Sequence, residues 1–289
     1  MSYQIIEAHR AVGGVETLCR ALDVSVSGYY AWRTRPPSQH QLTDAMLLKA
    51  IVTTYEASRG LYGSPRIHAA LRQQGLYCSR KRVARLMHQH GLHSRRRPKR
   101  RVHTTDSRHN RPVAPNLLKR DFSAAAPNEK WVGDIVGIWT NEGWLYLAAL
   151  LDTYSRFIVG WAMSAYRDEA LVTTALRMAL ARRDRPPASD LIQHTDRGSQ
   201  YTADDYLALL KAYSIQVSMS AKADPYDNAM MESFFSTLRA ELTDLERFAT
   251  RQAARTTVFE FIEVFYNRQR SHSSLGYRSP MAYETAHLS

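Results

Sequence analysis

The chain has 289 residues, 44% of them apolar, so it is long enough to form roughly two domains with a substantial buried core. Residues 1–120 carry 22 Lys and Arg against 6 Asp and Glu, whereas residues 121–289 carry 17 against 21; the basic half indicates nucleic acid as a partner, or otherwise an anionic membrane surface. The sequence has no signal-peptide pattern, no membrane-length apolar run and only two distant cysteines, Cys19 and Cys78, which argues against secretion, a membrane span, a disulfide framework and a zinc site.

Two short helical modules are predicted in the basic half. Residues 15–32 have apolar side chains at helical spacing with one interruption, which predicts helix, turn and helix, with Ser25 or Ser27 as the second cap. Residues 62–92 repeat this pattern, and Ser79 is placed to cap the second helix of that pair. Paired helices of this kind are typical of helix-turn-helix DNA-binding modules.

Basic side chains are concentrated at two places in this half. The helix after Ser79 begins with Arg80, Lys81, Arg82 and Arg85, and the linker at residues 94–128 contains Arg95, Arg96, Arg97, Lys99, Arg100 and Arg101. We predict that both sets contact a DNA backbone or minor groove. The alternatives are a solvated helix face for the first set and a solubilising tether for the second.

The second half alternates strand-like and helical segments. Its first three strands are separated by turns too short for parallel crossovers, so they must pair antiparallel. Two further strands, each preceded by a helix, complete a mixed five-stranded sheet with flanking helices, which is the topology of ribonuclease-H-like folds. The predicted strands are residues 131–140, 144–151, 156–163, 191–194 and 215–219, and the predicted helices are residues 168–183, 203–213 and 253–266. The expected class is α/β, preceded by all-α helix-turn-helix modules.

Three carboxylates occupy informative positions in this layout. Asp134 lies midway along the first strand, Asp196 at the carboxyl end of the fourth, and Glu232 early in a helix that Asp227 or Asn228 can cap. The first and fourth strands are neighbours in this topology, so the two aspartates should face each other and repel unless a cation lies between them. Oxygen ligands suit Mg²⁺ or Mn²⁺, and two such ions can activate chemistry at a phosphodiester. Taken singly, each acid also has an ordinary structural explanation: a bend, an Asx turn or a helix start.

The spacing of the last two acids adds a family resemblance. Asp196 and Glu232 are separated by 35 residues and lie within HTDRGSQY and DNAMMESFF. These segments, with YGSPRI, WVGDI, LDTYSR and YNRQRSHSSLGYRSPMAYE, resemble the orfB-type catalytic frame of bacterial insertion-sequence transposases, which are related to retroviral integrases. The resemblance implies a DDE-type integrase core in which Asp134, Asp196 and Glu232 bind two Mg²⁺ ions for 3′-end cleavage and strand transfer.

The resemblance also implies partners and a location. It points to double-stranded DNA, both the terminal inverted repeats of the element and the target, and to at least a homodimer on paired ends. A small orfA-type helix-turn-helix protein, or a frameshift fusion with it, is the expected protein partner. The location implied is the bacterial cytoplasm, in association with the nucleoid.

Four further residues are assigned as candidate DNA contacts. Arg239 lies two helical turns past Glu232, where the family has a basic residue thought to hold donor DNA; the alternative is an ion pair with Glu241 or Asp244. The others are Lys222, in a loop at residues 221–226 that departs from the family pattern, and Arg270 and His272, in the terminal motif, which are either DNA contacts or packing residues.

Two residues are assigned as possible supports of the metal site. His194 lies two residues before Asp196 on the same strand face, where a core histidine is the alternative interpretation. Asn228 precedes the helix that carries Glu232.

These predictions divide the chain into five parts. They are a helical segment at 1–38, a second helix-turn-helix module at 39–93, the basic linker at 94–128, the catalytic core at 129–245 and a C-terminal helix with tail at 246–289. The function they favour is a DNA transposase. A sequence-specific repressor whose sheet domain only oligomerises, and a nuclease that cuts without joining strands, are the alternatives.

Overall fold

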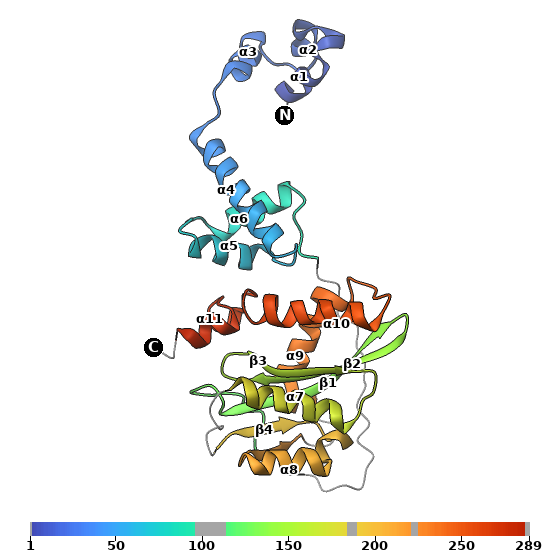
Figure 1. Cartoon of the computed structure of the whole chain (residues 1–289). Helices are drawn as coiled ribbons and strands as arrows, with labels where there is room; N and C mark the ends of the chain where they lie inside the picture. Colours follow the sequence, from blue (N-terminus) through green and yellow to red (C-terminus); the bar gives the residue numbers. More distant parts are fainter. Residues whose placement is uncertain (1, 96–113, 184–189, 221–224, 287–289) are drawn as a thin grey trace.

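The computed structural model describes residues 2–95, 114–183, 190–220 and 225–286. Figure 1 shows helices at the N-terminal end of the chain and a sheet flanked by helices in the rest. No helix among these described residues is long and apolar enough to cross a membrane.

Three helices form the N-terminal bundle: α1 (Ser2–Gly13), α2 (Val15–Ala21) and α3 (Val26–Thr34). The predicted pair at residues 15–32 is present, and Ser25 is the cap, because its hydroxyl accepts a hydrogen bond from the Gly28 N–H. Helix α1 was not predicted; it completes a small core made by Ile6, Cys19 and Tyr29. A two-helix unit cannot bury its apolar side chains alone, so this third helix supplies the missing surface.

The second module also has one helix more than predicted. Helices α5 (Ser64–Gln73) and α6 (Arg80–Gln89) match the expected pair, with Ser79 as the cap of α6. The addition is α4 (Gln39–Ala57), which begins at a capping box formed by Ser38 and Gln41. The first two turns of α4, before Leu47, lack buried apolar side chains, which is why the apolar pattern of this helix is weak; in Figure 1 these turns extend toward the N-terminal bundle.

The sheet has the predicted ribonuclease-H-like arrangement, with strand order β3-β2-β1-β4-β5. Strand β1 pairs antiparallel with β2, and β2 with β3, whereas β4 runs parallel to both β1 and β5. The strands are β1 (Lys130–Thr140), β2 (Gly143–Asp152), β3 (Ile158–Ser164), β4 (Ile192–Thr195) and β5 (Gln216–Met219). The predicted fold class is confirmed.

Helices cover both faces of the sheet (Figure 1). Helices α7 (Glu169–Arg182) and α8 (Asp204–Ala212) share a core with Trp131 and Ile135 of β1. Residues of α9 (Ala229–Leu238) and α10 (Arg251–Phe259) share the other core with Val132 and Val136. Alternate β1 side chains therefore enter different cores, as the two-residue period of a strand requires.

The C-terminal region continues from α9 and α10 through short elements. The predicted helix at 253–266 is α10 followed by the π-helical η4 (Glu260–Tyr266), and a similar turn, η3 (Arg239–Thr243), follows α9. The remaining elements are the 3₁₀ turns η1 (Ser199–Thr202), η2 (Pro225–Asn228) and η5 (Ser273–Leu275), and the helix α11 (Pro280–Thr285).

The α4–α6 module packs on the sheet domain through this C-terminal region. Ile67 and Val83 of the module belong to the same hydrophobic cluster as Phe234 of α9 and Phe261 of η4. The Tyr62 hydroxyl accepts a hydrogen bond from the Ser271 N–H at 2.7 Å. Arg66 of α5 lies 3.5 Å from Glu241 of η3. A continuous core and polar contacts thus join the module to the elements beside α9.

Strand β3 approaches α7 closely at Gly160. A Cβ there would lie 2.3 Å from the carbonyl oxygen of Ala175 and 2.7 Å from the backbone nitrogen of Ala179. Because these are backbone atoms of a packed helix, Gly160→Ala must displace α7, and we expect a loss of about 1–3 kcal/mol in the free energy of unfolding. Urea unfolding followed by tryptophan fluorescence measures the loss. An unchanged unfolding midpoint would contradict the close approach.

Candidate active site

The parallel pairing of β1 with β4 brings two of the predicted acids together. Val132 is in register with His194, and Gly133 with Thr195, so the next step of this register places Asp134 beside Asp196. Burial, followed by the Asp196 carboxylate, raises the pKa of Asp134 to about 8. The predicted convergence of the first and fourth strands is therefore present in the structure.

Each aspartate has one oxygen positioned by a backbone donor. The Oδ1 atom of Asp134 accepts from the Ile135 N–H at 2.7 Å, and that of Asp196 from the Gly198 N–H at 2.9 Å. The second bond is the Asx turn that was the ordinary interpretation of Asp196. This turn is compatible with a ligand role, because a carboxylate has two oxygens and several lone pairs.

Glu232 lies in the first turn of α9, whose start is attached to β1. Asn228 occupies the N-cap position but makes no side-chain cap; its Nδ2 instead donates to the Gly133 carbonyl at 3.2 Å. The predicted capping role is therefore wrong for Asn228, because its amide is used to hold α9 against the residue that precedes Asp134. Glu232 is exposed, and its charge also contributes to the raised pKa of Asp134.

The acids form a pair with a nearby third member. Among the described residues, no group of three or more His, Cys, Asp or Glu side chains is arranged to hold one metal ion. Asp134 and Asp196 are adjacent, whereas the exposed Glu232 side chain is not gathered with them into a three-ligand cluster. The donor set fits a hard divalent cation, because it consists of carboxylate oxygens whose mutual repulsion a cation would relieve.

Arg167 is a neighbour of this pair that the sequence did not reveal. Its positive charge acts to lower the pKa of Asp134, opposing burial and Asp196. Arg167 lies in the loop before α7, and its backbone carbonyl accepts a hydrogen bond from Gln200 at 3.2 Å. No motif identified this residue, because a loop arginine far from Asp134 in the chain has no distinguishing pattern.

His194 is a core histidine. Its ring nitrogens lie 2.8 Å from the Ser218 hydroxyl and 3.1 Å from the Ser220 hydroxyl, on β5 and just beyond it. Burial lowers the pKa of His194 to about 4, with Asp227 acting in the opposite direction. The ring is therefore neutral at physiological pH, and both nitrogens are used to hold β4 against β5.

Comparisons with known proteins agree on the family. Integrase core domain models match residues 124–225 and 213–280, and an HTH-like domain model matches residues 41–100. Transposase InsF for insertion sequence IS3A of Escherichia coli (strain K12) is 43% identical over 295 residues, covering 100% of both chains. The chain belongs to the IS3-type insertion-sequence transposases.

Further similarities are broader. The insertion element IS600 uncharacterized 31 kDa protein of Shigella sonnei is 44% identical over 266 residues, covering 92% of this transposase and 97% of that protein. Among solved structures, a simian T-cell lymphotropic virus intasome matches with a TM-score of 0.47 and 16% identity, covering 75% and 70% of the two chains. The HTLV-2 integrase catalytic core domain in complex with magnesium matches with a TM-score of 0.42 and 14% identity, covering 56% and 99%.

The basic side chains predicted on α6 of the transposase separate into two pairs. Arg80 and Lys81 are exposed. Arg82 and Arg85 instead bind Asp44 of α4, at 2.6 Å and 2.7 Å. The spacing of the arginines within α6 did not reveal these ion pairs, because Asp44 belongs to α4, the helix that was not predicted.

The other candidate DNA contacts differ in how exposed they are. Arg95 is exposed, and its backbone N–H donates to the Gly60 carbonyl at 3.0 Å. Arg239 is partly buried at the junction of α9 and η3, and no ion pair joins it to Glu241 or Asp244 in the described part of the chain. Six of the predicted DNA contacts lie outside the described residues: Arg96, Arg97, Lys99, Arg100, Arg101 and Lys222.

Arg270 and His272 are buried beneath the surface of the transposase. Arg270 is 3% exposed and binds both oxygens of Glu241, each at 2.7 Å. One of its nitrogens also lies 3.3 Å from Nε2 of His272, whose ring packs edge-on against Tyr266. The buried side chain of Glu241 was not predicted to pair with Arg270, because 28 residues separate them and only the packing of η3 against the C-terminal segment joins them.

Acid should destabilise the protein through His272. Burial, followed by the charges of Arg270, Arg156 and Arg66, lowers the pKa of His272 from 6.5 to about 2. Below pH 6.5 the unfolded chain binds a proton at His272 and the folded chain does not. The free energy of unfolding is therefore unaffected by His272 above pH 6.5 and falls as the pH drops below that value. Between pH 6.5 and 4.5, wild type should lose about 1.4 kcal/mol per pH unit relative to His272→Asn, a difference measurable by urea unfolding. Parallel pH profiles of the two proteins would contradict this.

Proposed function

We propose that this transposase cleaves the 3′ ends of its element and joins them to target DNA, with Asp134, Asp196 and Glu232 as the catalytic acids. The observation that supports this best is the β1–β4 register, which places Asp134 beside Asp196 at the end of two parallel strands. The bond from Asn228 to the Gly133 carbonyl supports the third assignment, because it holds the start of α9 next to Asp134.

The three acids would hold Mg²⁺, or Mn²⁺ in its place, and the family resemblance implies two ions. When bound, such cations activate an attacking oxygen and stabilise the charge that develops on a phosphodiester. The protein fixes the aspartates through the Ile135 and Gly198 N–H groups. Asp134 is partly buried, so its repulsion with Asp196 is screened less than it would be in water, which favours cation uptake.

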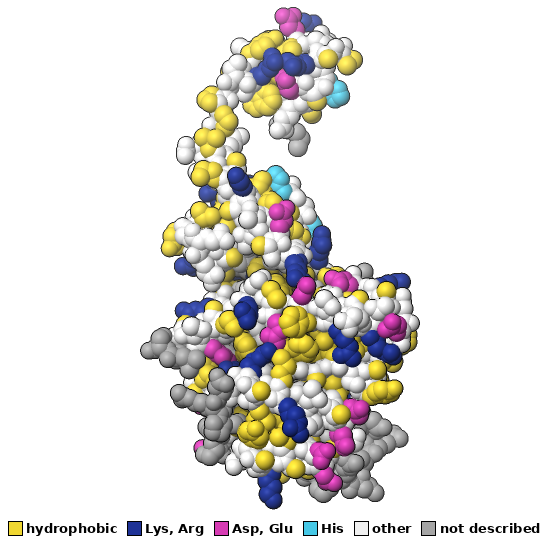
Figure 2. Space-filling model, viewed as in Figure 1, with side chains coloured by type: hydrophobic (Ala, Val, Ile, Leu, Met, Phe, Trp, Pro, Cys, Tyr) yellow, Lys and Arg dark blue, Asp and Glu magenta, His cyan; other side chains and the backbone are white. Residues whose placement is uncertain are grey.

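Binding of the element ends is assigned to the basic, helical part of the chain. Its support is the HTH-like match at residues 41–100 and the exposed Arg80 and Lys81 at the start of α6. Figure 2 shows one face of the molecule, with Lys and Arg side chains on both the helical part and the sheet domain. Several of them lie near the level where the helical part meets the sheet domain. We assign residues 1–93 and the linker at 94–128 to DNA binding, and residues 129–289 to the catalytic core and its C-terminal cover.

Two DNA ends must be held together for joining, so we infer at least a dimer. A small helix-turn-helix protein encoded by the element, or a fusion with it, is the proposed protein partner, and the bacterial cytoplasm is the proposed location. Size measurement of the protein on one and on two DNA ends tests the dimer.

A cleavage and joining assay tests the proposed function. The full chain is incubated with a labelled duplex of the element end, a supercoiled target and Mg²⁺, with a chelator added to a matched reaction. We expect 3′-end nicks and joined products only in the reaction with Mg²⁺. DNA binding without products in either reaction would favour a repressor, and Mg²⁺-dependent nicks without joined products would favour a nuclease.

A further inference from the structure

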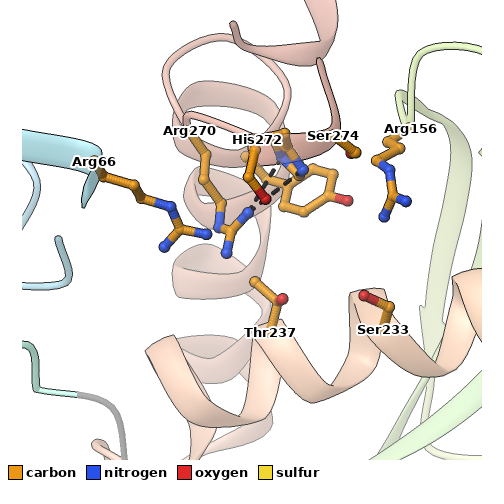
Figure 3. A pocket seen from close by; sticks show the side chains of 9 residues that line it. Arg66, Arg156, Ser233, Thr237, Arg270, His272 and Ser274 are labelled. Atoms are coloured by element: carbon orange, nitrogen blue, oxygen red, sulfur yellow. Dashed lines mark hydrogen bonds between the residues drawn. The ribbon is translucent and has the colours of Figure 1, made fainter. Parts of the chain in front are cut away.

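A polar cavity of about 140 Å³ lies beside α9, where the α4–α6 module meets the C-terminal segment. Arg66 of α5, Arg156 of the β2–β3 turn and Arg270 all line it, and Figure 3 shows these side chains converging on it from different elements. Ser233 and Thr237 line it from α9. Water occupies about 30 Å³ per molecule in the liquid, so the cavity has room for a group the size of several waters.

The charges around the cavity favour an anion. Three guanidinium groups face it, and the nearby carboxylate of Glu241 is bound by Arg270 at 2.7 Å through both oxygens. Glu241 also lies 3.5 Å from Arg66, and none of the ion pairs found among the described residues includes Arg156. Burial, followed by the charges of the same three arginines, lowers the pKa of His272, as expected beside several guanidinium groups.

The shape of the cavity favours a phosphate group at its mouth. Arg270 and His272 at its base are buried, whereas Ser233 and Ser273 at its rim are exposed, so the cavity opens to solvent past hydroxyl groups. Guanidinium forks and hydroxyls are the donors that bind phosphate oxygens. Ser233 directly follows Glu232 in α9, so their Cα atoms are ~3.8 Å apart and the mouth of the cavity lies next to the turn of α9 that carries the proposed third acid.

We propose that this cavity binds a backbone phosphate of the DNA strand held at the candidate active site, with Arg156 and Arg66 as the phosphate ligands and Arg270 as their buried support. The proposal rests on the proposed function, because it takes the bound strand to be that of the element end. The proposal also gives Arg270 a different role from the DNA contact predicted for it. Arg270 would hold Glu241 and the base of the cavity.

Arg156 provides the sharper test because of its backbone. Its φ is 62°, in the left-handed region, where Asn is tolerated better than most residues. Arg156→Asn therefore removes the charge without disfavouring the backbone. Arg177 is the control: it is exposed on α7, on the face of the sheet opposite α9, and it does not line the cavity. Arg177→Asn makes the same chemical change outside the proposed site and outside residues 1–128.

The measurement is the salt dependence of binding to the element-end duplex, by fluorescence anisotropy, in a full chain that also carries Asp196→Asn so that no cleavage occurs. Arg156→Asn should reduce the slope of log K against log salt by about 1 and weaken binding roughly tenfold at low salt, because one phosphate contact is lost. Arg177→Asn should keep the slope of its parent. A duplex with one neutral methylphosphonate next to the cleaved position should weaken binding by the parent and have little further effect on Arg156→Asn.

Two results would overturn the proposal. One is an unchanged slope in Arg156→Asn. The other is evidence that the cavity binds free inorganic phosphate and not DNA. Phosphate would then raise the melting temperature of wild type but not of Arg156→Asn, while the two proteins bind the duplex equally well. The proposed function fails separately: it is lost if wild type binds the duplex but yields no joined product, whatever the slopes show.

Discussion

Asp196→Asn should reduce strand cleavage and joining by roughly 10³-fold or more, and Glu232→Gln should do the same. Each change removes a negatively charged oxygen donor from the proposed cation site, and a catalytic cation contributes several kcal/mol of transition-state stabilisation. Of the two residues, Asp196 interacts more strongly with Asp134, because its carboxylate raises the pKa of Asp134 more than that of Glu232 does. The measurement is the rate of 3′-end cleavage and of joined product at saturating DNA and Mg²⁺.

Asp205→Asn is the control for this experiment. Asp205 is an exposed acid in the first turn of α8, so the substitution makes the same chemical change outside the site. It should retain wild-type rates. Both catalytic variants should remain folded, and Mg²⁺ should raise the melting temperature of wild type more than that of Asp196→Asn, because a ligand stabilises only the protein that binds it. Wild-type rates in Asp196→Asn and Glu232→Gln would overturn the assignment.

Glu241→Gln should destabilise the fold by about 3–5 kcal/mol, the range found when one partner of a buried ion pair is removed. Glu241 is 4% exposed and holds Arg270, which is 3% exposed, through two hydrogen bonds. Without the carboxylate, the guanidinium stays buried with its charge uncompensated, and Arg66 adds a second positive charge nearby. Urea unfolding at pH 7, followed by tryptophan fluorescence, measures the loss.

The double variant Glu241→Leu with Arg270→Met separates charge from volume. Replacing both partners of a buried pair by apolar side chains of similar size is often neutral or stabilising, because no charge remains to be desolvated. We therefore expect the double variant to be clearly more stable than Glu241→Gln. Equal losses in the two proteins would show that packing around η3, and not the buried charge, accounts for the effect.

Much of the catalytic core was predictable because its signals are local. Apolar runs and turn residues between 131 and 219 predict all five strands, and the short turns between the first three require antiparallel pairing. The positions of Asp134 and Asp196 on neighbouring strands follow from that order. The helices α1 and α4 were missed, since each depends on partners elsewhere in its module for most of its burial.

The roles of the arginines were the least predictable part. Arg82 and Arg85 have the pattern of a DNA-binding helix face, yet they bind Asp44. Arg270 has the position of a terminal-motif DNA contact, yet it binds Glu241. A guanidinium can reach a carboxylate or a phosphate equally well, so its partner depends on which acid the fold brings within reach.

The sequence alone determined the class of protein and the strand order, and it selected the three acids proposed for the site, because periodicity, turn residues and motif spacing are encoded over short stretches of chain. Only the tertiary structure decided that the exposed Glu232 is not gathered with the two aspartates, and which arginines are already paired. It also decided that Arg66, Arg156 and Arg270 surround one cavity. The physical reason is that burial and charge pairing depend on distances between elements remote in the chain, which no local pattern specifies.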